Sequence, residues 1–174
     1  MGKNMKQISQ SFFILLVLLS AVSSAQVADA PANVAAALTV KLVGFAQNLS
    51  ETGKEITIHV IGAPDVAAEL EKGIGKPVGK ATLKGVTSGS GMPASVPTVL
   101  FIGDASKLAD GIAYTQSNKI LSITSKPDLV SKGSTLGVGV GEDGKPKILL
   151  NLTSSNEEGI NWNPAIMKVA QTIK

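Results

Sequence analysis

The feature that most constrains the fold is a short, uninterrupted apolar run, Val99–Ile102, which lies between Pro97 and Gly103. A strand that alternates apolar and polar residues buries one face, whereas a continuous apolar run predicts a strand that is buried on both faces. Strands of this kind belong to parallel sheets that carry helices on each side. Residues 99–102 therefore predict the centre of an α/β sheet.

Strands and helices are predicted to alternate along the rest of the chain. Helix predictions depend on apolar residues at intervals of three and four, and on Pro or a capping side chain in the first turn. The Asp-Gly pair within 142–145 predicts a hairpin between the last two strands. This order of strands and helices predicts a mostly parallel α/β sheet with helices on both faces and an antiparallel hairpin at or near one edge. Besides 99–102, the predicted strands are 56–61, 78–86, 120–124, 135–140 and 147–152, and the predicted helices are 34–49 and those beginning near Pro64, Asp104 and Asn163.

The first 25 residues have the pattern of a cleaved secretory signal. A basic start precedes the apolar stretch 12–22, and small residues end at Ala25. This stretch is shorter than the roughly 20 residues of a membrane-spanning helix, so a retained anchor or a buried helix is the less favoured interpretation. We expect residues 1–25 to be removed, 26–33 to form a loose lead-in, and 34–174 to fold as one domain that is not embedded in the membrane.

Composition argues against several classes of function. The chain of 174 residues has no Arg, no Cys, and only one His, one Trp and one Tyr. Without Arg it lacks the usual bidentate ligand for phosphate and guanine, and its few aromatic rings offer little for base stacking. No nucleic-acid partner is therefore expected. The absence of Cys also excludes thiol catalysis, thiolate metal sites and lipid attachment to an N-terminal Cys.

The residues that carry chemistry do not form a coherent catalytic or metal site. His59 is the single histidine and is predicted to be a structural residue of a strand. Residues 139–144 have the spacing of a dinucleotide fingerprint, but they join two strands instead of a strand and a helix. The paired acids at 142–143 and 157–158 are predicted to be solvated turn residues. We therefore expect no enzyme activity, no cofactor and no metal.

Two features are candidates for binding another protein. Leu38, Leu42, Phe45 and Leu49 form one apolar stripe of the first predicted helix. The favoured interpretation is that the stripe covers the sheet, and the alternative is that a partner or a second subunit shares it. Trp162 is either a packed anchor or an exposed contact residue. The candidate partner or dimer contacts are Leu42, Phe45, Leu49 and Trp162.

Segments spread over nearly the whole predicted domain resemble those of a known family. Their order and spacing, together with the signal pattern, are similar to those of the YfiR-like family of exported bacterial proteins. The clearest segment is 147–152, where the family has a strand that ends in an Ile-Asn-Leu-like triplet. The segments are 56–62, 99–103, 119–125, 133–136, 147–152, 159–163 and 166–170.

The resemblance implies a Rossmann-like fold and a regulatory protein of the periplasm. Members of the family restrain an inner-membrane diguanylate cyclase, are withdrawn by an outer-membrane lipoprotein, and usually form dimers, so they control cyclic di-GMP and biofilm formation. The expected partners are therefore a membrane signalling protein, an outer-membrane lipoprotein and a second copy of the chain. The alternative function is a small-molecule binding domain that uses the crevice at the strand carboxyl ends, near Gly62 and Gly103.

Overall fold

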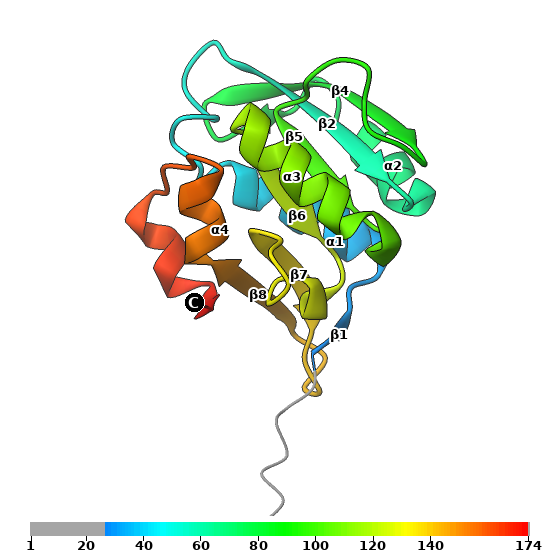
Figure 1. Cartoon of the computed structure of the whole chain (residues 1–174). Helices are drawn as coiled ribbons and strands as arrows, with labels where there is room; N and C mark the ends of the chain where they lie inside the picture. The colour runs from blue at the N-terminus through cyan, green and yellow to red at the C-terminus, as the bar shows by residue number, and fades with distance from the viewer. Residues whose placement is uncertain (1–26, 174) are drawn as a thin grey trace, which may run out of the picture.

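One mixed sheet forms the centre of the protein in a computed structural model that describes residues 27–173 (Figure 1). The predicted signal segment lies outside these residues. The sheet order is β3-β4-β2-β5-β6-β7-β8-β9, and β1 pairs with β7. The strands are β1 Ala28–Asp29, β2 Glu55–Ile61, β3 Pro77–Val78, β4 Ala81–Gly89, β5 Val99–Ile102, β6 Leu121–Thr124, β7 Leu136–Val140, β8 Pro146–Asn151 and β9 Gln171–Ile173.

Helices cover both faces of the sheet. In Figure 1, α3 crosses one face and α1 lies behind the other. The α2 helix packs beside α1 and against β4 and β2. None of the helices in residues 27–173 has the length and apolar character needed to cross a membrane. The helices are α1 Ala32–Val43, α2 Pro64–Glu71, α3 Leu108–Asn118 and α4 Leu152–Glu157, with short 3-10 helices η1 Ala105–Lys107, η2 Pro127–Leu129 and η3 Pro164–Lys168.

The strand pairing confirms the predicted fold class. The five strands from β4 to β7 in the sheet order run parallel, and β7 and β8 form the antiparallel hairpin. Gly144, with φ of 71°, supplies the left-handed conformation of the hairpin turn. Because β9 pairs in parallel with the outer side of β8, the hairpin lies near one edge and not at it.

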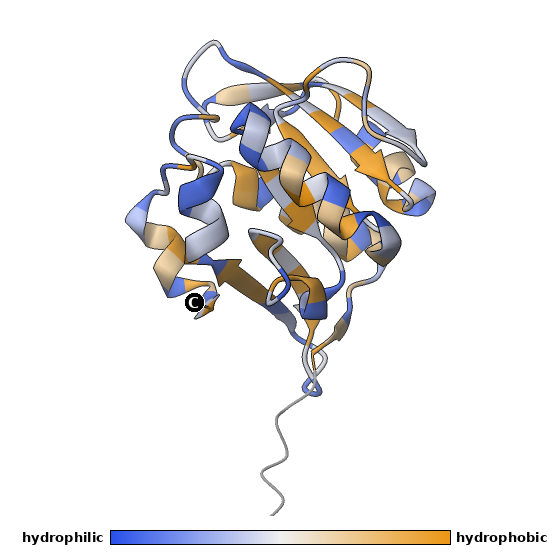
Figure 2. Cartoon of the chain, in the orientation of Figure 1, coloured by the Kyte–Doolittle hydropathy of each residue, from blue (hydrophilic) through white to orange (hydrophobic). Residues whose placement is uncertain are grey.

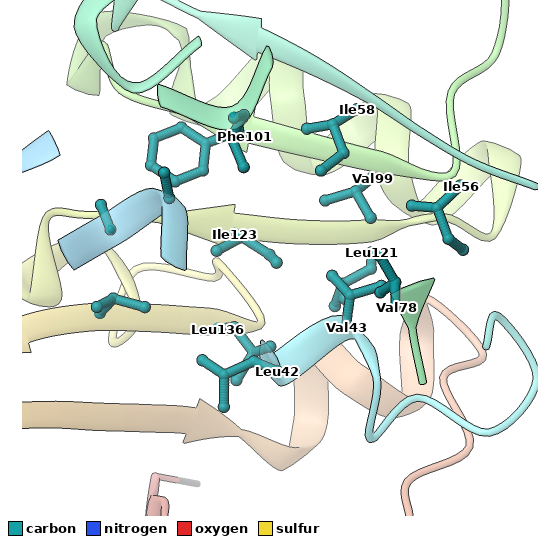
Figure 3. Close-up of a cluster of buried hydrophobic side chains, with 14 of the residues drawn as sticks. Leu42, Val43, Ile56, Ile58, Val78, Val99, Phe101, Leu121, Ile123 and Leu136 are labelled. Carbon is teal, nitrogen blue, oxygen red and sulfur yellow. The ribbon is translucent and has the colours of Figure 1, made fainter. Parts of the chain in front are cut away.

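The apolar run that predicted the sheet centre is buried on both faces. Val99 and Phe101 of β5 belong to the core under α1 and α2, whereas Leu100 and Ile102 belong to a second core under α3. All four side chains have an exposed fraction of 0%. Figure 3 shows the first core, with Phe101 and Val99 next to residues from β2, β6 and α1, and Figure 2 shows the same central strands as apolar.

Several local predictions differ from the structure. The predicted strand 78–86 is two antiparallel strands, β3 and β4, joined by a turn at residues 79–80. The first helix was predicted to reach residue 49, but α1 ends at Val43 and a turn follows. The lead-in contains the short strand β1, which pairs with the end of β7. In place of the predicted last helix, the structure has the short 3-10 helix η3 and the strand β9. Asn163 was predicted as a cap, and it caps η3 by accepting a hydrogen bond from the Ala165 N–H.

Candidate interaction surface

The turn that follows α1 is bound to the segment that precedes η3. Ala46 and Trp162 form an isolated antiparallel bridge. The N–H of Asn163 donates a hydrogen bond of 2.8 Å to the carbonyl of Phe45. These backbone bonds give the chain after Val43 partners outside the helix, which is the physical reason that α1 ends there instead of continuing to residue 49.

The side-chain amide of Asn48 adds two hydrogen bonds to this connection, one as a donor and one as an acceptor. Its Nδ2 donates to the carbonyl of Gly159 at 3.1 Å, and its Oδ1 accepts from the N–H of Asn161 at 3.0 Å. Asn48 and Asn161 are 113 positions apart in the sequence. The turn after α1 and the segment 159–163 therefore form one unit, which we call the α1–C-terminal clasp (residues 44–50 and 159–163).

The clasp contains three of the four predicted contact residues. Phe45, Leu49 and Trp162 are half-buried and pack against the main core, so part of each side chain faces solvent. Leu42 is 1% exposed and lies near Leu136 in the core shown in Figure 3. Leu42 therefore covers the sheet, as the favoured interpretation has it, and offers no surface to a partner. The other three remain candidate contacts.

Two exposed apolar residues that were not predicted as contacts follow the clasp in the sequence. Met167 and Val169 have exposed fractions of 48% and 49%. Val169 lies outside η3, which ends at Lys168, and it precedes β9. Within η3, Ile166 is the residue that is fully buried. Met167 and Val169 lie a few residues after Trp162.

Glu158 is the polar residue that sequence reasoning placed wrongly. It was predicted in a solvated turn, but it has an exposed fraction of 0%. Its Oε1 accepts a hydrogen bond of 2.7 Å from the Thr115 hydroxyl of α3. Its Oε2 accepts from the Ser122 N–H of β6 at 3.0 Å and from the Thr135 hydroxyl at 2.6 Å. The carboxyl group thus ties the end of α4 to three other parts of the domain.

Burial raises the pKa of the Glu158 carboxyl above its ordinary range, and the hydrogen bonds from Ser122, Thr115 and Thr135 only partly offset this effect. The surrounding hydroxyls also suit the protonated acid. The Thr115 hydroxyl lies 3.0 Å from the carbonyl of Ile112 and can donate to it. A protonated Oε1 can then donate to Thr115, so every polar atom in the chain of bonds keeps a partner.

Of the crevice proposed for a small ligand near Gly62 and Gly103, the part between the ends of β2 and β5 is closed by close packing of the backbone. A Cβ built on Gly62 would lie 2.5 Å from the Asp104 Cβ, and one built on Gly103 would lie 2.4 Å from the Ala63 Cβ. The backbones after β2 and β5 are therefore packed against each other. A hollow of about 270 Å³, lined by Gly62, opens at the carboxyl ends of the parallel strands β2 and β4. Its lining has no titratable group, and binding of a small molecule there stays a prediction.

His59 has a structural role on β2. Its exposed fraction is 7%, its Nε2 lies 3.1 Å from the carbonyl of Gly91, and its Nδ1 lies 2.8 Å from the Thr87 hydroxyl. Because a carbonyl only accepts, Nε2 carries the proton and holds the 89–98 loop. In residues 27–173, no group of three or more His, Cys, Asp or Glu side chains is arranged to hold a metal ion.

Comparison with known proteins identifies the family of the chain. The sequence model of the YfiR/HmsC-like family matches residues 32–171, which extend from the start of α1 to the start of β9. The chain belongs to the YfiR/HmsC-like family. No curated protein matches the chain.

Membership of the family has a general functional meaning. YfiR/HmsC-like proteins are periplasmic regulators of cyclic di-GMP signalling and are not known as enzymes. They act with membrane signalling proteins. For a protein of this family, the part of the surface that matters most is therefore the part that can bind another protein, and the clasp and the residues after it are the first candidates.

Proposed function

We propose that this protein is a periplasmic repressor that binds the periplasmic part of an inner-membrane diguanylate cyclase or a similar signalling protein. In the proposed mechanism the bound regulator lowers synthesis of cyclic di-GMP, and an outer-membrane lipoprotein withdraws the regulator to restore synthesis. Membership of the YfiR/HmsC-like family is the observation that carries this proposal.

We further propose that the partner binds at the apolar surface around the clasp. Phe45, Leu49 and Trp162 are half-buried there, and Met167 and Val169 are exposed. Half-buried aromatic rings on a rigid backbone are typical anchors of protein–protein interfaces, because they bury a large area at a small cost in side-chain entropy. The Trp162 indole N–H donates to the Ser155 hydroxyl, which fixes the orientation of the ring.

Deletion of the gene tests the regulatory role. We expect the deletion strain to contain more cyclic di-GMP than the parent and to form more biofilm, with both restored by the gene supplied in trans. In vivo crosslinking should recover a membrane signalling protein bound to the regulator. Unchanged cyclic di-GMP under envelope stress, together with no membrane protein among the crosslinked products, would refute the proposal.

Two surface variants test the binding site. The double variant Met167→Glu and Val169→Glu places charges on residues that are already exposed, so the fold should be unaffected. We expect binding to the recovered partner to weaken by about 2 kcal/mol, roughly thirtyfold. The control is Tyr114→Glu, which changes a half-buried aromatic residue of α3 on the opposite face of the sheet. An equal loss of binding in the control would show that the clasp surface is not the site.

A further inference from the structure

A second surface runs along the solvent side of α1. Three hollows of about 270, 410 and 420 Å³ adjoin one another there. The first and second share Ala37 and Val40, and the second and third share Gly44 and Gly79. They therefore form one continuous depression between α1 and the chain from the end of α2 to Lys80, which we call the α1 groove.

Small and apolar residues form the floor of the α1 groove. Ala37, Val40 and Phe45 line its centre. A Cβ built on Gly44 would lie 3.1 Å from the backbone nitrogen of Gly79, and one built on Gly79, which has φ of 64°, would lie 2.9 Å from the Ser50 Cβ. The two glycines let the walls approach closely while the groove stays open above them.

The rim of the α1 groove carries positive charge that nothing nearby compensates. Lys41, Lys76 and Lys80 line the groove and are exposed, and within residues 27–173 none of them forms a salt bridge.

The two acidic residues of the lining are already neutralised by other lysines. Glu69 pairs with Lys72 at 2.6 Å, and Glu51 pairs with Lys54 at 2.9 Å. The three remaining rim lysines therefore leave the α1 groove with a positive field above an apolar floor.

We propose that the α1 groove is a docking site for an acidic amphipathic helix of a partner protein. The inference deepens the proposed function and rests on it, since the helix belongs to the regulated membrane protein. A narrow apolar floor fits the apolar stripe of a helix, and small residues such as Ala37 and Gly44 allow close packing of helix against helix. Acidic residues on both sides of that stripe would meet the lysines of the rim.

The backbone of the α1 groove also favours a helix over an extended strand. One wall is α1, whose interior N–H and carbonyl groups are bonded within the helix. The other wall contains an edge strand, β3, but β3 has only two residues and one of them, Pro77, has no N–H to donate. A helical partner satisfies its own backbone groups and needs only side-chain contacts. A second copy of this chain is disfavoured, because a two-fold contact across the groove would place Lys41, Lys76 and Lys80 near the same lysines of the other copy.

The first test uses a defined probe. The probe is an 18-residue model helix, about five turns long, with Leu and Ala on one stripe and Glu on the flanks, and its matched control has Lys in place of Glu. Fluorescence anisotropy with the full mature chain should show binding of the Glu helix that weakens with salt. The triple variant Lys41→Glu, Lys76→Glu and Lys80→Glu should bind at least tenfold more weakly. Equal binding of the Glu and Lys helices would overturn the proposal.

A matched control variant distinguishes the effect of charge in the α1 groove from the effect of the net charge of the protein on binding. Lys107→Glu, Lys132→Glu and Lys145→Glu change the total charge by the same amount, but these residues lie beside α3 and in the β7–β8 hairpin. We expect this variant to bind the Glu helix as the wild type does. A loss equal to that of the groove variant would overturn the proposal. Thermal melting of both variants identifies any loss of binding that comes from unfolding. If the groove variant unfolds, Lys→Gln substitutions at the same three positions replace the Lys→Glu ones, and they should bind the Glu helix with intermediate affinity.

The second test distinguishes this inference from the proposed function. A photo-crosslinking amino acid is placed at Ala37 in the α1 groove and, separately, at Met167 on the clasp surface. Crosslinking from Ala37 to an acidic helical peptide of a membrane signalling protein, with loss of the product in the groove variant, supports the inference. Crosslinking of that protein from Met167 alone, or of a second copy from Ala37, overturns the inference and leaves the proposed function intact. No membrane protein captured from either position overturns both.

Discussion

The two faces of the central sheet are both buried, but they are built from different side chains. The face under α1 and α2 is apolar along its whole width. Its residues fill space and need no specific partners, and Figure 3 shows residues of α1 beside those of the sheet strands. The strands from β5 to β7 contribute Val99, Phe101, Leu121, Ile123, Leu136 and Val138 to it, all with an exposed fraction of 0%.

The face under α3 changes in character from one strand to the next. On β5 it is apolar, with Leu100 and Ile102, but on β6 the corresponding residues are Ser122 and Thr124. Beyond them lies Glu158, which accepts hydrogen bonds from two threonine hydroxyls and one backbone N–H. The stability of this face therefore depends on hydrogen bonds of fixed geometry, whereas the stability of the other face depends on side chains that fill the space. The difference predicts which perturbations each face tolerates.

The largest effect is expected from a cavity on the apolar face. Phe101→Ala should lower the free energy of unfolding by about 3–5 kcal/mol, because it removes a fully buried ring and leaves a cavity in close-packed surroundings. Chemical denaturation at neutral pH measures the loss. Val96→Ala, at a residue that is 56% exposed, should change stability by less than about 0.5 kcal/mol. A loss below about 1 kcal/mol for Phe101→Ala would contradict the description of this face as densely packed.

The same substitution should have opposite effects on the two faces. Thr135→Val removes a hydroxyl that donates to Glu158 and should lower the free energy of unfolding by about 1–3 kcal/mol. Thr39 lies on α1 with an exposed fraction of 0%, and its hydroxyl has no hydrogen-bond partner within residues 27–173. Thr39→Val should therefore raise stability by about 1 kcal/mol, because it removes an unsatisfied buried polar group. Denaturation of both variants under one condition checks the signs, and equal signs would remove the distinction between the faces.

The smallest effect is a change in pH dependence on the α3 face. The folded state raises the pKa of Glu158 above its ordinary value of 4.5, so the folded state binds this proton more tightly than the unfolded state does. The stabilising contribution is complete below pH 4.5 and is lost as the pH rises through the folded-state pKa. Its slope cannot exceed about 1.4 kcal/mol per pH unit.

Glu158→Gln should remove this contribution. The amide N–H of the new side chain can donate to Thr115, and its carbonyl can accept from Ser122 and Thr135, as the protonated acid does. The stability of the wild type relative to the variant should therefore fall as the pH rises from 4.5 towards neutrality. The control is Glu157→Gln at the exposed neighbouring position, which should follow the wild type. Parallel curves for the wild type and Glu158→Gln would contradict the prediction.

Local pattern was sufficient to predict the middle of the fold. The continuous run at 99–102 became β5 with the same bounds, and the Asp-Gly turn became the β7–β8 hairpin. Pro64 begins α2, and Asp104 caps η1 by accepting from the Ser106 N–H. Each of these features is decided by residues that lie within a few positions of one another, which is why the sequence alone reveals them.

The candidate site was predicted only in part, because its geometry depends on distant segments. Phe45 and Leu49 were proposed as part of one helical stripe and Trp162 as a separate residue, but nothing near them in the sequence indicated that Ala46 and Trp162 would pair. The α1 groove could not be seen either, because its walls come from separate elements.

The sequence by itself determined the fold class and the order of the central elements, because the period of apolar residues records which faces of a strand or helix are buried. The family came from the resemblance of whole segments and not from this period. The tertiary structure alone decided where α1 ends, that the last element is a strand, and that Glu158 is buried. Whether a polar group is buried, and where a helix ends, depends on whether another segment of the chain supplies a hydrogen-bond partner. For the side chains of Glu158 and of Asn48 in the clasp, those partners lie 23 to 113 residues away in the chain.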